Sequence, residues 1–124
     1  AKDKISHIIY DLDDSKFPYG SYKIVNFTQK DLAVKFGEDT FKLAPQSNRL
    51  VNLAQKNKLQ AISCKMAIQE DGEYKLVYSN MLMNRPNKRM LMFFYNAEDG
   101  EGSVTIKSRS LVDFQQAKLS EGKD

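Results

Sequence analysis

The segment of residues 61–83, AISCKMAIQEDGEYKLVYSNMLM, alternates apolar and polar side chains on either side of an Asp-Gly turn. Successive side chains of a β-strand point to opposite faces, so the alternation predicts two strands that each bury one face. Gly72 supplies the positive φ of a tight turn at low steric cost. We therefore expect an antiparallel hairpin in which residues 60–69 pair with residues 73–83. Regular alternation groups Ile62, Cys64, Met66 and Ile68 on one face of the first strand, and Tyr74, Leu76, Tyr78, Asn80 and Leu82 on one face of the second.

The same pattern predicts further strands along the chain. Apolar residues alternate over residues 32–36 and again over 41–43, separated by Gly37-Glu38-Asp39 and ended by Pro45, which indicates a second hairpin. The run at 90–95, MLMFFY, is apolar on both faces, which is typical of a central strand that is covered on each side. Other strands are expected at 5–11, 21–28, 49–53 and 103–107, the last continuing to residue 114.

Eight or nine short strands, with turn residues between them, predict an all-β fold. We expect an antiparallel two-sheet sandwich, Ig-like or jelly-roll-like, that forms one domain over residues 1–119 and ends in a polar tail over residues 120–124. Two segments, 47–59 and 110–119, also fit short helices, because Ser110 is a suitable N-cap and residues 50–54 are helix-tolerant. The choice between strand and helix stays open there.

The composition narrows the class of protein more than the function. The 124 residues carry a net charge of only +3, whereas nucleic-acid binders concentrate basic residues on one face. No apolar run is long enough for a transmembrane helix, and the single cysteine, Cys64, excludes an internal disulfide. The chain begins at Ala1 and shows no signal-peptide pattern, so we expect a mature chain whose export signal is not part of this sequence.

The segment IIYDLDDS, residues 8–15, resembles the first motif of the haloacid-dehalogenase-like phosphatases. The resemblance implies Asp11 as nucleophile and Asp13 as acid/base. That chemistry also requires a magnesium site and a parallel sheet joined by crossover helices, which the alternating hairpins argue against. An EF-hand calcium loop would need a glycine at its sixth position and a glutamate at its twelfth, and both are missing. We interpret the acidic residues as the polar end of a strand, and cation binding by Asp11, Asp13 and Asp14 stays open.

Other catalytic and cofactor motifs are missing from the sequence. His7 is the only histidine, no G-x-S-x-G elbow is present, and neither phosphate-cradling glycine loop occurs. Cys64 shares its face with Ile62 and Met66, where a thiol packs as a small apolar group. We therefore expect no enzyme, no cofactor and no metal centre. The triplet Asn26-Phe27-Thr28 matches the N-glycosylation motif, but it lies in a predicted strand and we give it no weight.

Two groups of residues are candidates for binding. The first group is aromatic: Tyr10, Phe17, Tyr19 and Tyr22. Exposed aromatic rings can stack on sugars or on partner side chains, but packing at one end of the sandwich would explain these residues equally well. The second group is the basic loop of residues 84–89, which fits either a solvated turn or a site for an anion: Arg85, Lys88 and Arg89. Together with Phe93 and Tyr95, this loop is similar to the stacking platforms of single-strand nucleic-acid binders.

The segments YGSYKIVNFT (19–28), LAVKFG (32–37) and LAP (43–45) resemble small secreted or periplasmic bacterial β-sandwich domains, in which a strand ends in Asn and a Pro-Gly turn follows a short hairpin. Gln46 stands where those domains have the glycine. The resemblance covers about the first half of the chain and implies an envelope-associated module without catalytic residues. We expect a non-enzymatic module that binds a protein or glycan partner at the cell envelope. The alternative is an OB-like barrel that binds single-stranded nucleic acid.

Overall fold

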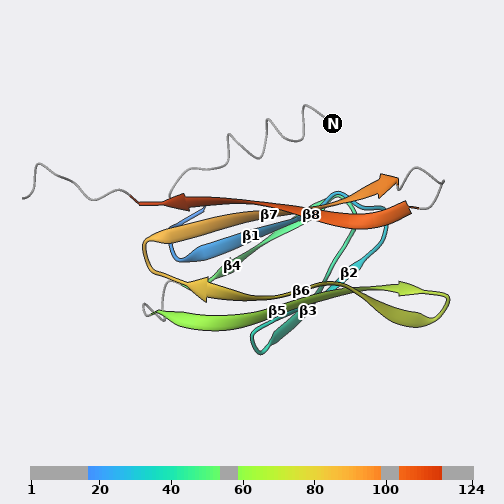
Figure 1. Cartoon of the computed structure of the whole chain (residues 1–124), viewed down its shortest axis with the longest axis horizontal. Coiled ribbons are helices and arrows are strands. Elements are labelled where there is room, and N and C mark those ends of the chain that lie inside the picture. The colour runs from blue at the N-terminus through green and yellow to red at the C-terminus, as the bar shows by residue number, and fades with distance from the viewer. Residues whose placement is uncertain (1–16, 54–58, 99–103, 116–124) are drawn as a thin grey trace, which may run out of the picture.

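The computed structural model describes residues 17–53, 59–98 and 104–115, and all regular structure in these ranges is β. Eight strands form two four-stranded sheets that lie face to face (Figure 1). This confirms the predicted all-β two-sheet sandwich. The strands are β1 (Ser21–Asn26), β2 (Leu32–Phe36), β3 (Asp39–Leu43), β4 (Ser47–Asn52), β5 (Gln60–Glu70), β6 (Glu73–Asn84), β7 (Lys88–Glu98) and β8 (Val104–Phe114).

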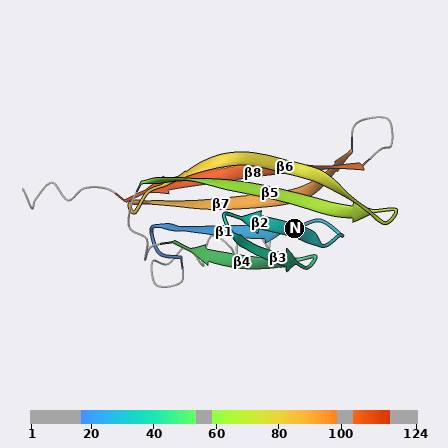
Figure 2. The ribbon, with the colours of Figure 1, turned by 90° about the horizontal axis from the view of Figure 1, so that it is seen from below.

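The strand order is β4-β1-β7-β8 in one sheet and β3-β2-β5-β6 in the other. Strands β6 and β8 lie at one side of the sandwich, and β3 and β4 lie at the other (Figure 2). One pairing differs from the predicted antiparallel pattern, because β1 and β7 run parallel with Tyr22 opposite Met90. Parallel neighbours need a long connection, and the chain between them contains the whole second sheet (β2, β3, β5 and β6) together with β4 of the first.

Strand β7 lies between β1 and β8, as its apolar sequence predicts. Met92 and Phe94 on one face belong to the main core between the sheets. Leu91 on the other face packs with Phe17 and Val25 in a second, smaller cluster on the outside of the sheet. Both faces of β7 are therefore covered, which explains why its sequence shows no alternation.

Both predicted hairpins are confirmed, and their turns follow from local chemistry. Glu70 lies opposite Glu73, and the two residues between them, Asp71 and Gly72, both have positive φ, at 53° and 80°. This is the backbone that a two-residue type I′ turn requires, and Asp-Gly is among the sequences that adopt it most readily. In the β2–β3 turn, Gly37 has a φ of 64°.

The long β5–β6 hairpin contains one irregularity. Met66 lies opposite Tyr78, whereas the next residue, Ala67, lies opposite Leu76. Val77 is therefore an extra residue on β6, which is the arrangement of a β-bulge. Because side chains alternate with a period of two, one extra residue moves those beyond it to the opposite face.

The bulge makes one prediction wrong. Regular alternation groups Tyr74 and Leu76 with Tyr78 and Leu82 on a single face. Leu82 is buried in the core and Tyr78 packs against it, as expected. Leu76 and Tyr74 are instead 57% and 61% exposed, because the extra residue Val77 turns them to the outer face of the sheet.

The end of β1 is held by a buried asparagine. The Asn26 side-chain amide donates to the carbonyl oxygens of Lys30 at 2.8 Å and Leu43 at 2.9 Å. Its oxygen accepts from the backbone N–H of Thr28 at 2.9 Å and from the Thr28 hydroxyl at 2.6 Å. Asn26 is fully buried, so the Asn-x-Thr triplet is a structural corner and not a surface glycosylation site.

The two segments with an open choice contain strands where the structure describes them. Strand β4 covers residues 47–52 and β8 continues to Phe114, so the helical alternatives are wrong for these residues. Residues 54–58 and 116–119 lie outside the described residues. The predicted strand at 5–11 and the tail at 120–124 also lie outside them.

Candidate binding face

The aromatic group predicted as a binding site does not form one exposed surface. Phe17 is buried in the outer cluster of the β4-β1-β7-β8 sheet. Tyr22 is buried between the two sheets, with its ring centroid 5.0 Å from that of Phe36. Tyr19 is partly buried, and Tyr10 lies outside the described residues. Packing accounts for Phe17 and Tyr22, and among the three described members of the group only Tyr19 keeps solvent exposure.

The three basic residues of the predicted loop site have different surroundings. Arg89 is buried: its Nε donates to Asp113 Oδ2 at 2.9 Å, and its Nη1 donates to the carbonyl oxygen of Phe17 at 2.9 Å. Lys88 is partly buried and donates to the carbonyl oxygen of Met83 at 2.8 Å. Its pKa is lowered by desolvation and by the neighbouring charge of Arg85. Arg85 is exposed. Arg89 therefore links elements of the fold and does not present its charge to solvent.

Among the residues that the structure describes, the remaining sequence candidates do not form a reactive centre. Cys64 is fully buried, and burial raises the pKa of its thiol to about 12, so the nucleophilic thiolate is strongly disfavoured. Within the described ranges, no three His, Cys, Asp or Glu residues gather where they could hold a metal ion. No helix in these ranges is long and apolar enough to cross a membrane. Asp11, Asp13 and Asp14 lie outside the described residues.

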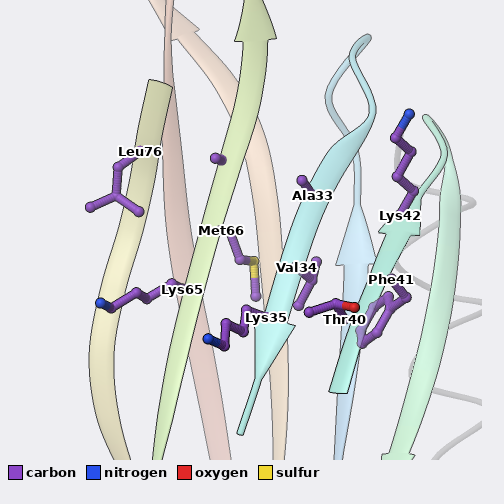
Figure 3. Close-up of a pocket in the computed structure, with 10 residues that line it drawn as sticks. Ala33, Val34, Lys35, Thr40, Phe41, Lys42, Lys65, Met66 and Leu76 are labelled. Carbon is purple, nitrogen blue, oxygen red and sulfur yellow. The ribbon is translucent and has the colours of Figure 1, made fainter. Parts of the chain in front are cut away.

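The outer face of the β3-β2-β5-β6 sheet is hollowed, and none of the predicted site residues that the structure describes belongs to it. A depression of about 410 Å³ lies over β2, β3 and β5 (Figure 3). A second hollow of about 260 Å³ shares Ala33 and Lys42 with the first and reaches Tyr74 on β6. The two hollows are therefore adjacent, and we call them together the groove. The first hollow is lined by Ala33, Val34, Lys35, Thr40, Phe41, Lys42, Lys65, Met66, Ala67 and Leu76.

A row of polar side chains crosses this face from strand to strand. Lys35 lies opposite Thr40 on β3 and opposite Lys65 on β5, and Lys65 lies opposite Ser79 on β6. All four side chains are exposed. We call these four residues the lysine row. Beside it, the small side chains of Ala33 and Ala67 lie opposite each other and leave the floor of the hollow open.

The two lysines of the row have an unfavourable electrostatic arrangement. Residues directly opposite on neighbouring strands are about 4.5–5.5 Å apart at Cα, and like charges in such a pair destabilise a sheet. In the described part of the chain, neither Lys35 nor Lys65 forms an ion pair. Lys30, near the other end of the groove, differs in this respect, because its Nζ lies 3.3 Å from Glu70 Oε2.

Large apolar side chains are exposed along the outer face of β6, next to the row. They are the β6 stripe: Tyr74, Leu76, Met81 and Met83, which are 61%, 57%, 60% and 40% exposed. Met81 lies opposite Ser63 and Met83 opposite Ala61, on the same face of the sheet as Leu76. In the described strand order β6 is an edge strand, and exposed apolar residues on an edge favour association with other chains.

The sequence contained only part of the signal for this face. Alternation places Lys35 and Lys65 on polar faces, but that they lie opposite each other depends on the register between β2 and β5. The stripe depends on the bulge at Val77, which the pattern does not reveal.

Comparison of the chain with protein-family models, with curated proteins and with solved structures finds no match.

Proposed function

We propose that this protein is a non-enzymatic binding module that holds a protein partner on the outer face of its β3-β2-β5-β6 sheet. The observation that carries the proposal is the β6 stripe, four large apolar side chains on one face of one strand. Exposed apolar side chains grouped in this way are typical of protein interaction sites, and methionine side chains adapt to the shape of a partner.

The groove beside the stripe supports the same function. Leu76 belongs both to the stripe and to the lining of the 410 Å³ hollow, so apolar contact on β6 continues directly into a concave, lysine-rimmed surface. A partner that covers β6 would therefore also cover this hollow. Hydrophobic contact at the centre with charged groups around it is the usual organisation of an interface.

A glycan partner is the second candidate, and one specific observation favours it. The exposed ring of Tyr74 lines the smaller hollow together with Asp31, Lys42 and Gln69. An aromatic face beside hydrogen-bonding side chains is the combination that sugar recognition uses. The stripe extends beyond this hollow to Met81 and Met83, which a glycan would leave uncovered, and for that reason we favour a protein.

The proposed place of action is the cell envelope or the exterior. The support for this comes from the resemblance to small secreted and periplasmic β-sandwich domains, through the segments at 19–28, 32–37 and 43–45. Fractionation of the source cells, with detection of the chain by an antibody, tests it. Recovery with cytoplasmic markers alone would contradict an envelope location.

The experiment on function compares two double variants in affinity capture from an envelope extract. Leu76→Ser with Met81→Ser removes the centre of the stripe. Leu111→Ser with Val112→Ser is the matched control, because these residues are 53% and 48% exposed on β8 of the other sheet. We expect proteins captured by the wild type to be lost with the first variant and kept with the second.

One outcome of this capture experiment would contradict the proposal. Capture of the same proteins by the wild type and by both double variants would exclude the stripe as the contact surface. A glycan array with the wild type and Tyr74→Ala distinguishes the second candidate. Sugar binding that depends on Tyr74 and survives Met81→Ser would favour a glycan over a protein.

A further inference from the structure

We propose that the lysine row recognises an acidic side chain in an extended segment of the partner, whose neighbouring apolar side chains lie on the β6 stripe. This inference rests on the proposed function and names the chemistry of the partner. The segment carries an apolar, an acidic and an apolar residue at alternate positions, all on the side that faces the sheet.

The first argument is electrostatic. Lys35 and Lys65 lie directly opposite each other, and the described part of the chain offers neither of them an acidic partner. Such a pair destabilises the sheet when nothing is bound. A carboxylate placed between the two ammonium groups converts this repulsion into two favourable interactions, and each ammonium is purely a hydrogen-bond donor.

The second argument is the chemistry of the whole row. Thr40 and Ser79 stand at its two ends, and their hydroxyl groups can also donate hydrogen bonds to an oxyanion. Four exposed donor side chains therefore cross the sheet in one line. Figure 3 shows the Lys35 and Lys65 side chains extending in the same direction across the face, toward β6. The positive charge is thus directed to the strand that carries the stripe.

The third argument is spacing along β6. Ser79 belongs to the lysine row and lies in the middle of the stripe, with Met81 on one side of it and Leu76 on the other. Outward side chains of a strand repeat about every 6.8 Å, and an extended partner segment has nearly the same repeat. A partner aligned with β6 therefore places an acidic residue at the row when its apolar residues lie on Met81 and Leu76.

The test uses short soluble peptides that differ in one group. One contains Leu-Ser-Glu-Ser-Leu and the other Leu-Ser-Gln-Ser-Leu, each flanked by the same polar residues, and binding is followed by amide chemical shifts in NMR. For the wild type we expect shifts at Lys65, Ser79 and Leu76, and affinity for the glutamate peptide about tenfold higher than for the glutamine peptide. Added salt should reduce this preference.

Two variants with the same loss of charge provide the control. Lys65→Gln should bind both peptides equally, and its melting temperature should not fall, because a repulsive pair is removed. Lys107→Gln removes one exposed charge from β8 and should keep the preference for glutamate. An equal reduction of the preference in both variants would mean non-specific attraction and would overturn the inference.

The remaining outcomes separate this inference from the proposed function. If both peptides bind equally and both are lost in Leu76→Ser, the stripe is a binding surface but the lysine row is not a carboxylate site. Absence of binding by either peptide also overturns the inference, while capture of a protein through the stripe would still support the proposed function. Saturable shifts of the same amides with inorganic phosphate, without competition from the glutamate peptide, would assign the lysine row to a free oxyanion. That result would overturn the inference that the row recognises a peptide segment.

Discussion

Replacement of Asn26 by alanine should be among the most destabilising single changes in this protein. The substitution removes a side chain that makes four hydrogen bonds in a fully buried position. The Lys30 carbonyl oxygen keeps a partner, because the Thr28 hydroxyl also lies 3.0 Å from it. The Leu43 carbonyl oxygen and the Thr28 backbone N–H lose the bonds that Asn26 makes to them.

The size of the effect follows from these two groups. A buried backbone group without a partner costs about 1–3 kcal/mol, so two of them predict a loss of about 4 kcal/mol in the free energy of unfolding. That is a large part of the roughly 5–15 kcal/mol by which domains of this size are stable. The loss should also loosen the contact between the β1 end and the β3 end, since the Asn26 amide bridges them.

Equilibrium unfolding in urea measures the change directly. Asn48→Ala is the matched control, because Asn48 is an exposed asparagine on the neighbouring strand β4, and we expect its effect to stay within about 0.5 kcal/mol. A loss below about 1 kcal/mol for Asn26→Ala, with an unchanged dependence on urea concentration, would refute the assignment of Asn26 as the bridge at this corner.

Three further predictions concern stability. Gln46 has a φ of 62°, and its Nε2 donates to two carbonyl oxygens. Gln46→Ala keeps the strained backbone and loses these bonds, so urea unfolding should show it to be about 1 kcal/mol less stable than Gln46→Gly, which relieves the strain. Equal stability of the two variants would contradict this. Arg89→Lys should lose about 2 kcal/mol, because one ammonium nitrogen replaces the separate guanidinium nitrogens that reach Asp113 and the Phe17 carbonyl oxygen. Arg85→Lys at the surface should be neutral, and a reversed order in thermal melts would exclude a structural role for Arg89. Burial raises the pKa of the Cys64 thiol from 9.0 to about 12, so the unfolded chain releases the thiol proton at a lower pH than the folded chain does. The free energy of unfolding should therefore fall as pH rises from 9 toward 12, by about 3 kcal/mol at pH 11. Cys64→Ala should show a smaller decline.

The candidate sites show where inference from the sequence was insufficient. The pattern correctly placed Cys64 in the core and kept core packing as the alternative for Phe17 and Tyr22. It could not show that Arg89 is buried, because the partner that holds its charge, Asp113, is 24 residues away in the chain. An arginine in a polar loop has the same local sequence whether it faces solvent or an ion-pair partner on another strand.

Local sequence was sufficient for the two hairpins, whereas it left the choice between strand and helix open at 47–59 and 110–119. Alternation with a period of two and the backbone preferences of Asp71, Gly72 and Gly37 are properties of adjacent residues, so they can be deduced without knowing what lies across the sheet. The apolar run of β7 likewise indicated its central position.

Tertiary structure decided everything that depends on the alignment of one strand with another. The parallel pairing of β1 with β7, the extra residue at Val77 and the opposition of Lys35 to Lys65 are all matters of register. Register is set by how side chains from distant segments fill a shared core, and a shift of one residue exchanges the inner face for the outer face. For that physical reason, the proposed binding face became visible only in the folded chain.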